Sequence, residues 1–181
     1  MKRVLRGILI LAVSILVPNS AGAEAVSENP GKLLGAMTFL PGDDAIPGWR
    51  RSEKVLRASN EEELYRVFNG GASLYIQHGF RSYVGQTYKG PEGKEIEVCI
   101  FDQGTFQNAG DLFENPYAKP SRIKEIANVG EKARIDLTPL FCYGLDFIQK
   151  GFFVRVIIQD KTEEGLNVAI SFAQGISNRI K

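Results

Sequence analysis

Residues 82–101 read SYVGQTYKGPEGKEIEVCIF, and they predict a β-hairpin at the centre of the fold. The two arms, 82–88 and 95–101, flank a turn that is rich in glycine and proline, as hairpin arms do. In the second arm, apolar residues alternate with their neighbours and so mark the face that points to a core: Ile96, Val98 and Ile100. An antiparallel sheet built around this hairpin is therefore expected.

The rest of the chain adds strands and helices to this hairpin. A second hairpin is expected between 145–149 and 152–159, and a short strand near 123–127. Helical periodicity and capping residues predict a pair of short helices from Ser59-Asn60 to Gly79, one helix from Thr105 to Glu114, and a long one from Thr162 to Arg179.

This order of elements predicts an α+β fold with a mainly antiparallel sheet of two hairpins plus an additional strand. The strand at 152–158 carries apolar residues in both phases of its alternation. A strand that is apolar on both sides is covered on both sides, so helices are expected on both faces, as in an α/β/α sandwich.

The N-terminus has the three parts of a secretory signal peptide. Lys2, Arg3 and Arg6 form a basic start, eleven apolar or small residues follow at 7–17, and Ala21-Gly22-Ala23 supplies a cleavage site. The apolar run is shorter than the roughly 20 residues that cross a bilayer. We therefore expect cleavage after Ala23 and a periplasmic or extracellular product with no membrane span.

We divide the chain into a signal peptide (1–23), an extended polar lead-in (24–47) and a single α+β domain (48–181). Cleavage removes three basic residues and no acidic one, so the net charge changes from +1 to −2. Acidic and basic residues are mixed along the mature chain, whereas nucleic-acid binding needs clustered Lys and Arg. The expected partner is an unknown protein or a small apolar ligand, and not a nucleic acid.

One stretch carries a resemblance to a known family. LYRVFNGGASLY at 64–75, followed by Gly79-Phe80, resembles the signature of a family of exported bacterial domains of unknown function. In that family a tryptophan precedes a helix that ends in an (Asp/Asn)-Gly-Gly-Ala turn; Trp49 matches, while Asn69 stands where aspartate is commoner. The resemblance implies no activity, cofactor or partner.

The two cysteines leave two alternatives open. In an oxidising compartment Cys99 and Cys142 form an even pair, for which a disulfide is one prediction. The other is two separate buried thiols, because cysteine also packs as a small core residue. Neither a Cys-x-x-Cys motif nor a metal-type spacing is present.

No catalytic residue, cofactor site or metal site is predicted. His78 is the one histidine and is expected beside a helix end, which excludes most catalytic triads and zinc sites. Asp102, at the end of a strand, is the acidic residue on which a carboxylate mechanism would depend, and a structural turn is the preferred interpretation.

The sequence thus favours an exported soluble module without catalytic activity, a binding or accessory protein of the bacterial envelope. The alternative is a periplasmic hydrolase that uses carboxylates. Several aromatic residues are candidates for a binding surface if they are exposed: Phe147, Phe152, Phe153, Tyr65 and Tyr75.

Overall fold

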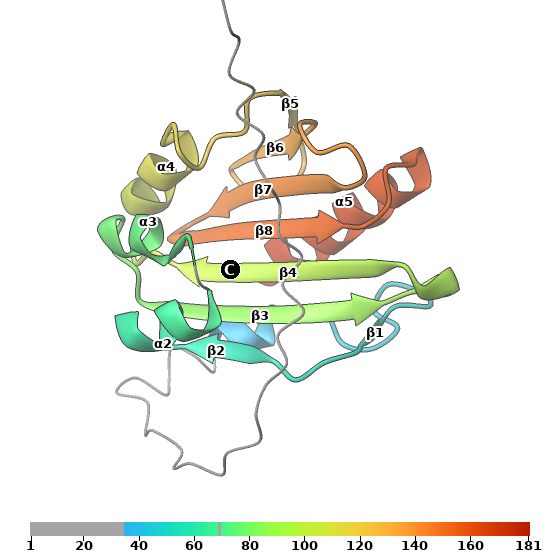
Figure 1. The fold of residues 1–181 in the computed structure, drawn as a ribbon, viewed down its shortest axis with the longest axis horizontal. Helices are drawn as coiled ribbons and strands as arrows, with labels where there is room; N and C mark the ends of the chain where they lie inside the picture. The colour runs from blue at the N-terminus through green and yellow to red at the C-terminus, as the bar shows by residue number, and fades with distance from the viewer. Residues whose placement is uncertain (1–34, 69) are drawn as a thin grey trace, which may run out of the picture.

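The structure, a computed structural model, describes residues 35–68 and 70–181. It is an α+β fold in which eight antiparallel strands form one sheet with helices on both faces, as predicted (Figure 1). The predicted signal peptide and most of the predicted lead-in, residues 1–34, lie outside the described residues.

The two predicted hairpins form the middle of the sheet. The strands are β1 (Arg50–Arg51), β2 (Leu56–Ala58), β3 (Ser82–Lys89), β4 (Glu95–Asp102), β5 (Ile123–Ile126), β6 (Lys132–Asp136), β7 (Tyr143–Gln149) and β8 (Phe152–Ile158). Their spatial order is β1-β3-β4-β8-β7-β6-β5, and β2 also pairs with β3. Because β4 pairs with β8, the hairpins β3–β4 and β7–β8 lie side by side.

The helices begin at the capping residues that the sequence offers. They are α2 (Glu61–Val67), α3 (Ala72–Gln77), α4 (Phe106–Glu114) and α5 (Glu163–Ser177). The side chains of Asn60, Thr105 and Thr162 accept a hydrogen bond from the backbone three residues later, which satisfies an N–H that the helix leaves unpaired. A single 3-10 turn, η1 (Pro91–Gly93), joins β3 to β4.

Strand alternation divides the core between the two faces of the sheet. On one face, Val98, Val154 and their neighbours pack against Phe172 and Ile176 of α5. On the other face, α2, α3 and α4 cover one end of the strands, where Phe101 and Phe153 are buried (Figure 1). The whole structure is therefore a sheet between two unequal helical layers.

The described part of the predicted lead-in belongs to the domain. Residues 35–38 are helical, and Ala36 and Leu40 are buried in the same core as α5. The boundary that the sequence places before Gly48 therefore lies at least twelve residues too late.

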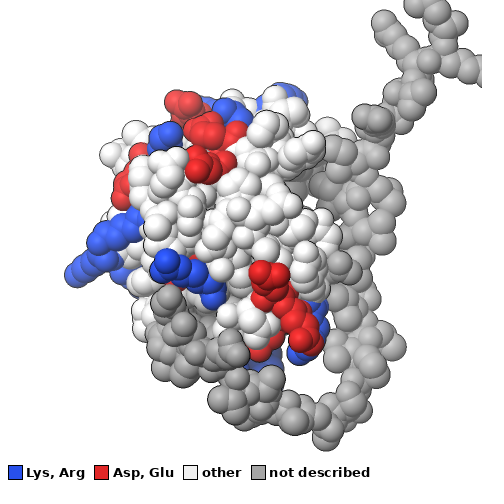
Figure 2. Space-filling view, turned by 90° about the vertical axis from the view of Figure 1, so that its left-hand side faces the viewer, with Lys and Arg blue, Asp and Glu red and all other residues white. Residues whose placement is uncertain are grey.

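The end of the molecule that carries α2, α3 and α4 has a mixed surface. Figure 2 shows acidic and basic side chains of the described residues scattered around a largely uncharged centre. This face therefore shows no extended surface of a single sign.

Candidate functional site

A cavity of about 330 Å³ lies at the end of the sheet where β8 ends and β4 begins. Its walls come from four separate segments: the loop before β1, the β3–β4 connection, the end of β8 with the residues after it, and the start of α5. The apolar part of the wall is formed by Ile46, Pro47, Trp49, Pro91, Ile158 and Val168, and four charged residues form most of the rest. A concave site of this size that combines apolar side chains with a few polar groups is a common form of small-molecule site.

Trp49 is the largest of these apolar residues, and the surrounding backbone holds it in place. A turn precedes it, in which the Trp49 N–H donates to the carbonyl of Ile46 at 3.0 Å. The indole packs edge-to-face on Phe172 of α5, with ring centroids 5.7 Å apart. A Cβ at Gly90 would lie 2.5 Å from the indole, so only glycine allows this close approach. The cavity therefore has one rigid aromatic wall.

Sheet register brings a charged pair to the cavity. Lys94 precedes β4 and Asp160 follows β8; because Ile96 pairs with Ile158, the two residues lie opposite each other beyond the ends of these strands. The Lys94 ammonium lies 3.0 Å from Oδ2 of Asp160, whose side chain is 8% exposed. This pair forms the polar part of the cavity lining.

Asp160 also caps the N-terminal end of α5. Its Oδ1 accepts a hydrogen bond from the Thr162 N–H at 2.9 Å, and a Cβ at Gly165 would lie 2.7 Å from its carboxyl carbon. The Thr162 hydrogen bond and the Lys94 ammonium lower the pKa of Asp160 below its usual value. The hydrogen bond to Asp160 raises the pKa of Lys94. Asp160 thus carries its negative charge at the positive end of the helix dipole.

Two further carboxylates line the cavity. Glu164 lies on the first turn of α5 with its side chain 81% exposed, and one of its oxygens is 4.0 Å from the Lys94 ammonium. Glu92 lies in η1 and is exposed, with φ at +57°. One ammonium therefore faces three carboxylates, counting Asp160.

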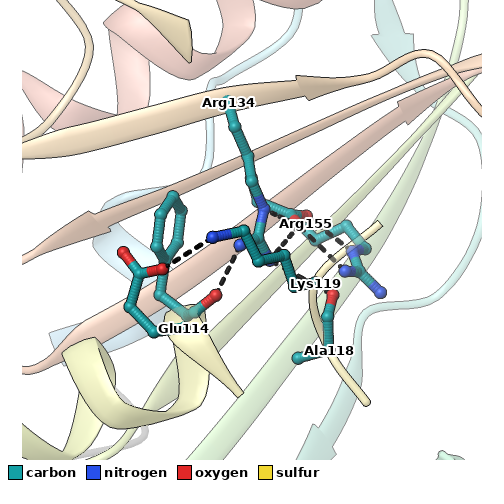
Figure 3. Close-up of polar contacts among 7 residues, drawn as sticks. Glu114, Ala118, Lys119, Arg134 and Arg155 are labelled. Carbon is teal, nitrogen blue, oxygen red and sulfur yellow. Dashed lines mark hydrogen bonds and ion pairs between the residues drawn. The ribbon is translucent and has the colours of Figure 1, made fainter. Parts of the chain in front are cut away.

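A second group of charged residues lies inside the fold, on the face under α4. Arg134, Asp146 and Arg155 stand opposite one another on β6, β7 and β8. Both guanidinium groups contact the Asp146 carboxylate, at 3.0 Å for Arg134 and 2.7 Å for Arg155. Figure 3 shows the two arginine side chains reaching toward each other. Arg134 and Asp146 are each 1% exposed. Each of these three ions therefore has an oppositely charged partner, which buried ions need.

The contacts of Arg134 give this group a structural role. Its guanidinium donates to the carbonyls of Phe113 and Ala118, at and beyond the C-terminal end of α4, and stacks 4.0 Å from the Phe113 ring (Figure 3). The Phe113 carbonyl is among those that a helix leaves unpaired at its end, and Ala118 lies in the segment that follows α4. Arg134 therefore fastens α4 to the sheet.

The predicted alternative of a Cys99–Cys142 disulfide is wrong for this structure, because both thiols are free. Cys99 lies in the middle of β4, while Cys142 precedes β7, on the far side of β8. The register separates them by four residues, about 13 Å along the strands, whereas disulfide-bonded residues need Cα atoms within about 7 Å. Burial raises the pKa of both thiols.

The structure places only part of the predicted aromatic surface outside the core. Phe147, Phe153 and Tyr75 are buried, so they are core residues and not a binding surface. Phe152 is half-buried against Phe39, and Tyr65 is 50% exposed on α2. The five candidates are therefore not brought together at one site.

His78 and Asp102 make contacts that stabilise the fold. Nδ1 of His78 lies 2.7 Å from the Leu74 carbonyl, and its Nε2 lies 3.3 Å from the Asn115 side chain. Asp102 accepts a hydrogen bond from the Gly104 N–H at 2.7 Å and so fixes the turn before α4. These contacts agree with the structural interpretation of both residues.

Sequence reasoning did not find the cavity. Trp49 stands out only as the tryptophan of the family resemblance, and Lys94, Asp160 and Glu164 share no motif or fixed spacing. The signal that could have found them is the pairing of β4 with β8, which a single sequence does not contain.

Comparison with known proteins shows the fold and nothing finer. No protein-family model and no curated protein sequence matches the chain. A solved structure with a similar fold is the extracellular domain of PknH from Mycobacterium tuberculosis, with a TM-score of 0.50 and 11% sequence identity. The match covers 78% of this chain and 94% of that domain. No helix among the residues that the structure describes is long and apolar enough to cross a membrane.

Proposed function

We propose that the mature chain is an exported, non-catalytic binding module of the bacterial envelope, and that it binds a small ligand in the cavity beside Trp49. The cavity is the observation that carries this proposal. Its volume of about 330 Å³ falls within the range of natural ligand sites. Its lining combines apolar side chains, which supply contact area, with charged side chains, which can orient a ligand.

Two observations favour binding over catalysis. The Cys99 thiol is buried in the sheet with a raised pKa, whereas a nucleophilic cysteine needs a lowered one. Asp102, on which the carboxylate hydrolase depends, is held in a backbone turn. The export part of the proposal rests on the N-terminal sequence, and the similar fold of an extracellular domain is compatible with it.

A fragment screen with a matched pair of variants tests the ligand site. Val168→Phe adds an aromatic ring inside the cavity, while Asn167→Phe adds the same ring at the neighbouring, exposed position of α5. Small aromatic and aliphatic fragments are screened by ligand-observed NMR, with the fluorescence of the one tryptophan, Trp49, as a second signal. We expect fragments that bind the wild type and Asn167→Phe but lose at least tenfold in affinity for Val168→Phe.

The proposal fails if no fragment binds the wild type, or if every fragment that binds does so equally in Val168→Phe. Circular dichroism of both variants separates a filled cavity from a lost fold. A folded Val168→Phe protein that has lost binding supports the assignment of the cavity.

A further inference from the structure

We propose, on the basis of the proposed function, that the cavity selects a small organic cation that carries an apolar body. The positive groups at this site are the first to consider, because they would attract an anion. The N-terminus of a long helix such as α5 is a natural anion site. Here Asp160 already occupies that position, with its carboxylate on the Thr162 N–H and its Cγ against Gly165.

Lys94 does not restore an anion site. Among the described residues that line the cavity it is the one cation, and its ammonium contacts Asp160 at 3.0 Å. A Glu164 oxygen also lies 4.0 Å from this ammonium. An anionic ligand at Lys94 would therefore meet two carboxylates at close range, and like charges at close range raise the free energy of binding.

The remaining charges favour a cation. With one ammonium and three carboxylates, the lining has a net charge of −2. Glu92 and Glu164 are both exposed and lie on segments that approach the cavity from different sides, the β3–β4 connection and α5. An exposed carboxylate changes the affinity for a cation only by roughly two- to fivefold, so the expected charge preference is real but moderate.

The apolar wall defines the rest of the ligand. An engineered apolar cavity of about 150 Å³ is enough to hold benzene, and this cavity is about twice that size at about 330 Å³. One aromatic ring or a short aliphatic chain therefore fits against Trp49, Pro47 and Val168, while an ammonium or guanidinium head remains near Glu92 and Glu164.

Three probes of the same shape separate charge from apolar contact. 3-Phenylpropylamine is a cation at pH 7, 3-phenylpropionate is an anion, and 3-phenylpropanol is neutral, and all three carry a three-carbon chain on the ring. Each is titrated into the mature protein, with Trp49 fluorescence and ligand-observed NMR as readouts. We expect affinity to fall in the order amine, alcohol, carboxylate, with at least tenfold between the first and the last. Raising the salt concentration should weaken binding of the amine more than binding of the alcohol, because salt screens interactions between charges.

A pair of double variants assigns the preference to the cavity. Glu92→Gln with Glu164→Gln removes both exposed carboxylates of the lining, and we expect amine affinity to fall to that of the alcohol. Glu61→Gln with Glu62→Gln makes the same charge change on exposed residues of α2, away from the cavity. This control should leave the ratio of amine affinity to alcohol affinity unchanged.

The outcomes distinguish this inference from the proposed function. If the carboxylate binds as tightly as the amine, the ligand class is wrong while the cavity stays a binding site. If Glu92→Gln with Glu164→Gln keeps the amine preference, the assignment of that preference to these two carboxylates is wrong. If none of the three probes binds although library fragments bind in a manner that Val168→Phe abolishes, the inference fails alone. If nothing binds at all, both fail.

Discussion

Asp160 connects the stability of the domain to its cavity. It caps the start of α5 through the Thr162 N–H and pairs with Lys94, so it joins β4, β8 and α5. Because these contacts lower the pKa of Asp160 in the folded protein, folding favours its ionised form. The stabilisation is complete above the unfolded pKa of about 4 and is lost as the pH falls through the lower pKa of the folded state.

The replacement Asp160→Asn should therefore remove a stabilisation that depends on pH. We expect the free energy of unfolding at pH 7 to fall by about 1 kcal/mol, and the variant to lose less stability than the wild type between pH 5 and pH 2. Urea unfolding across this range measures both. Asp44→Asn is the control, because Asp44 makes an exposed ion pair with Arg50 and should contribute little. Equal acid sensitivity of Asp160→Asn and the wild type would contradict the assignment.

At the scale of elements, α4 depends on one side chain of the sheet. Arg134 holds the carbonyls of Phe113 and Ala118 and shares Asp146 with Arg155. Arg134→Met should cost about 3 kcal/mol of the free energy of unfolding, because it leaves these buried carbonyls without their donor. Hydrogen exchange should also show the amides of α4 opening before the rest of the domain.

Arg155→Met provides the comparison for α4. It makes the same charge change in the same group, but Arg155 contacts Asp146 and the Phe153 ring and not α4. Asp146 keeps Arg134 as its partner, so we expect a smaller loss and unchanged exchange in α4. If both variants open α4 equally, then the charge of the group and not the contact with α4 is what holds the helix.

The sequence predicts those elements that carry a regular apolar pattern and a capping residue. The two hairpins, α4 and α5 are confirmed, because alternation and the caps Thr105 and Thr162 mark them locally. The sequence does not predict β6, because its apolar phase holds only Ala133 and Ile135; alternation places Arg134 on the polar side, yet Arg134 is buried under α4. Only pairing with Asp146, twelve residues later, makes that position tolerable.

The cavity could not be predicted for a related reason that concerns the whole molecule. Its lining is drawn from the loop before β1, the β3–β4 connection, the end of β8 and the start of α5, and these segments meet only because β4 pairs with β8. Which hairpins lie next to each other depends on how both faces of the sheet are covered. That information is spread over the entire chain and has no local pattern.

Secretion into an oxidising compartment would test whether the two cysteines of the whole molecule stay unbonded. If residues 1–23 are removed during secretion, the mature chain begins at Glu24 and enters an oxidising compartment with two cysteines. The register keeps Cys99 and Cys142 too far apart to bond, so we expect two thiols per chain from the secreted protein unfolded without reductant. N-terminal sequencing of the same sample should give Glu24-Ala25-Val26.

In the folded protein the two thiols should react with a thiol reagent at different rates. Cys142 is half-buried near the surface and should react with a thiol reagent within minutes, whereas Cys99 is buried in β4 and should react only when the sheet opens. Its labelling rate should therefore rise with urea in step with global unfolding. Cys142→Ser identifies the fast signal. A secreted protein with no reactive thiol after unfolding would mean that the two cysteines do bond, and that the register of β4, β8 and β7 differs from the one described.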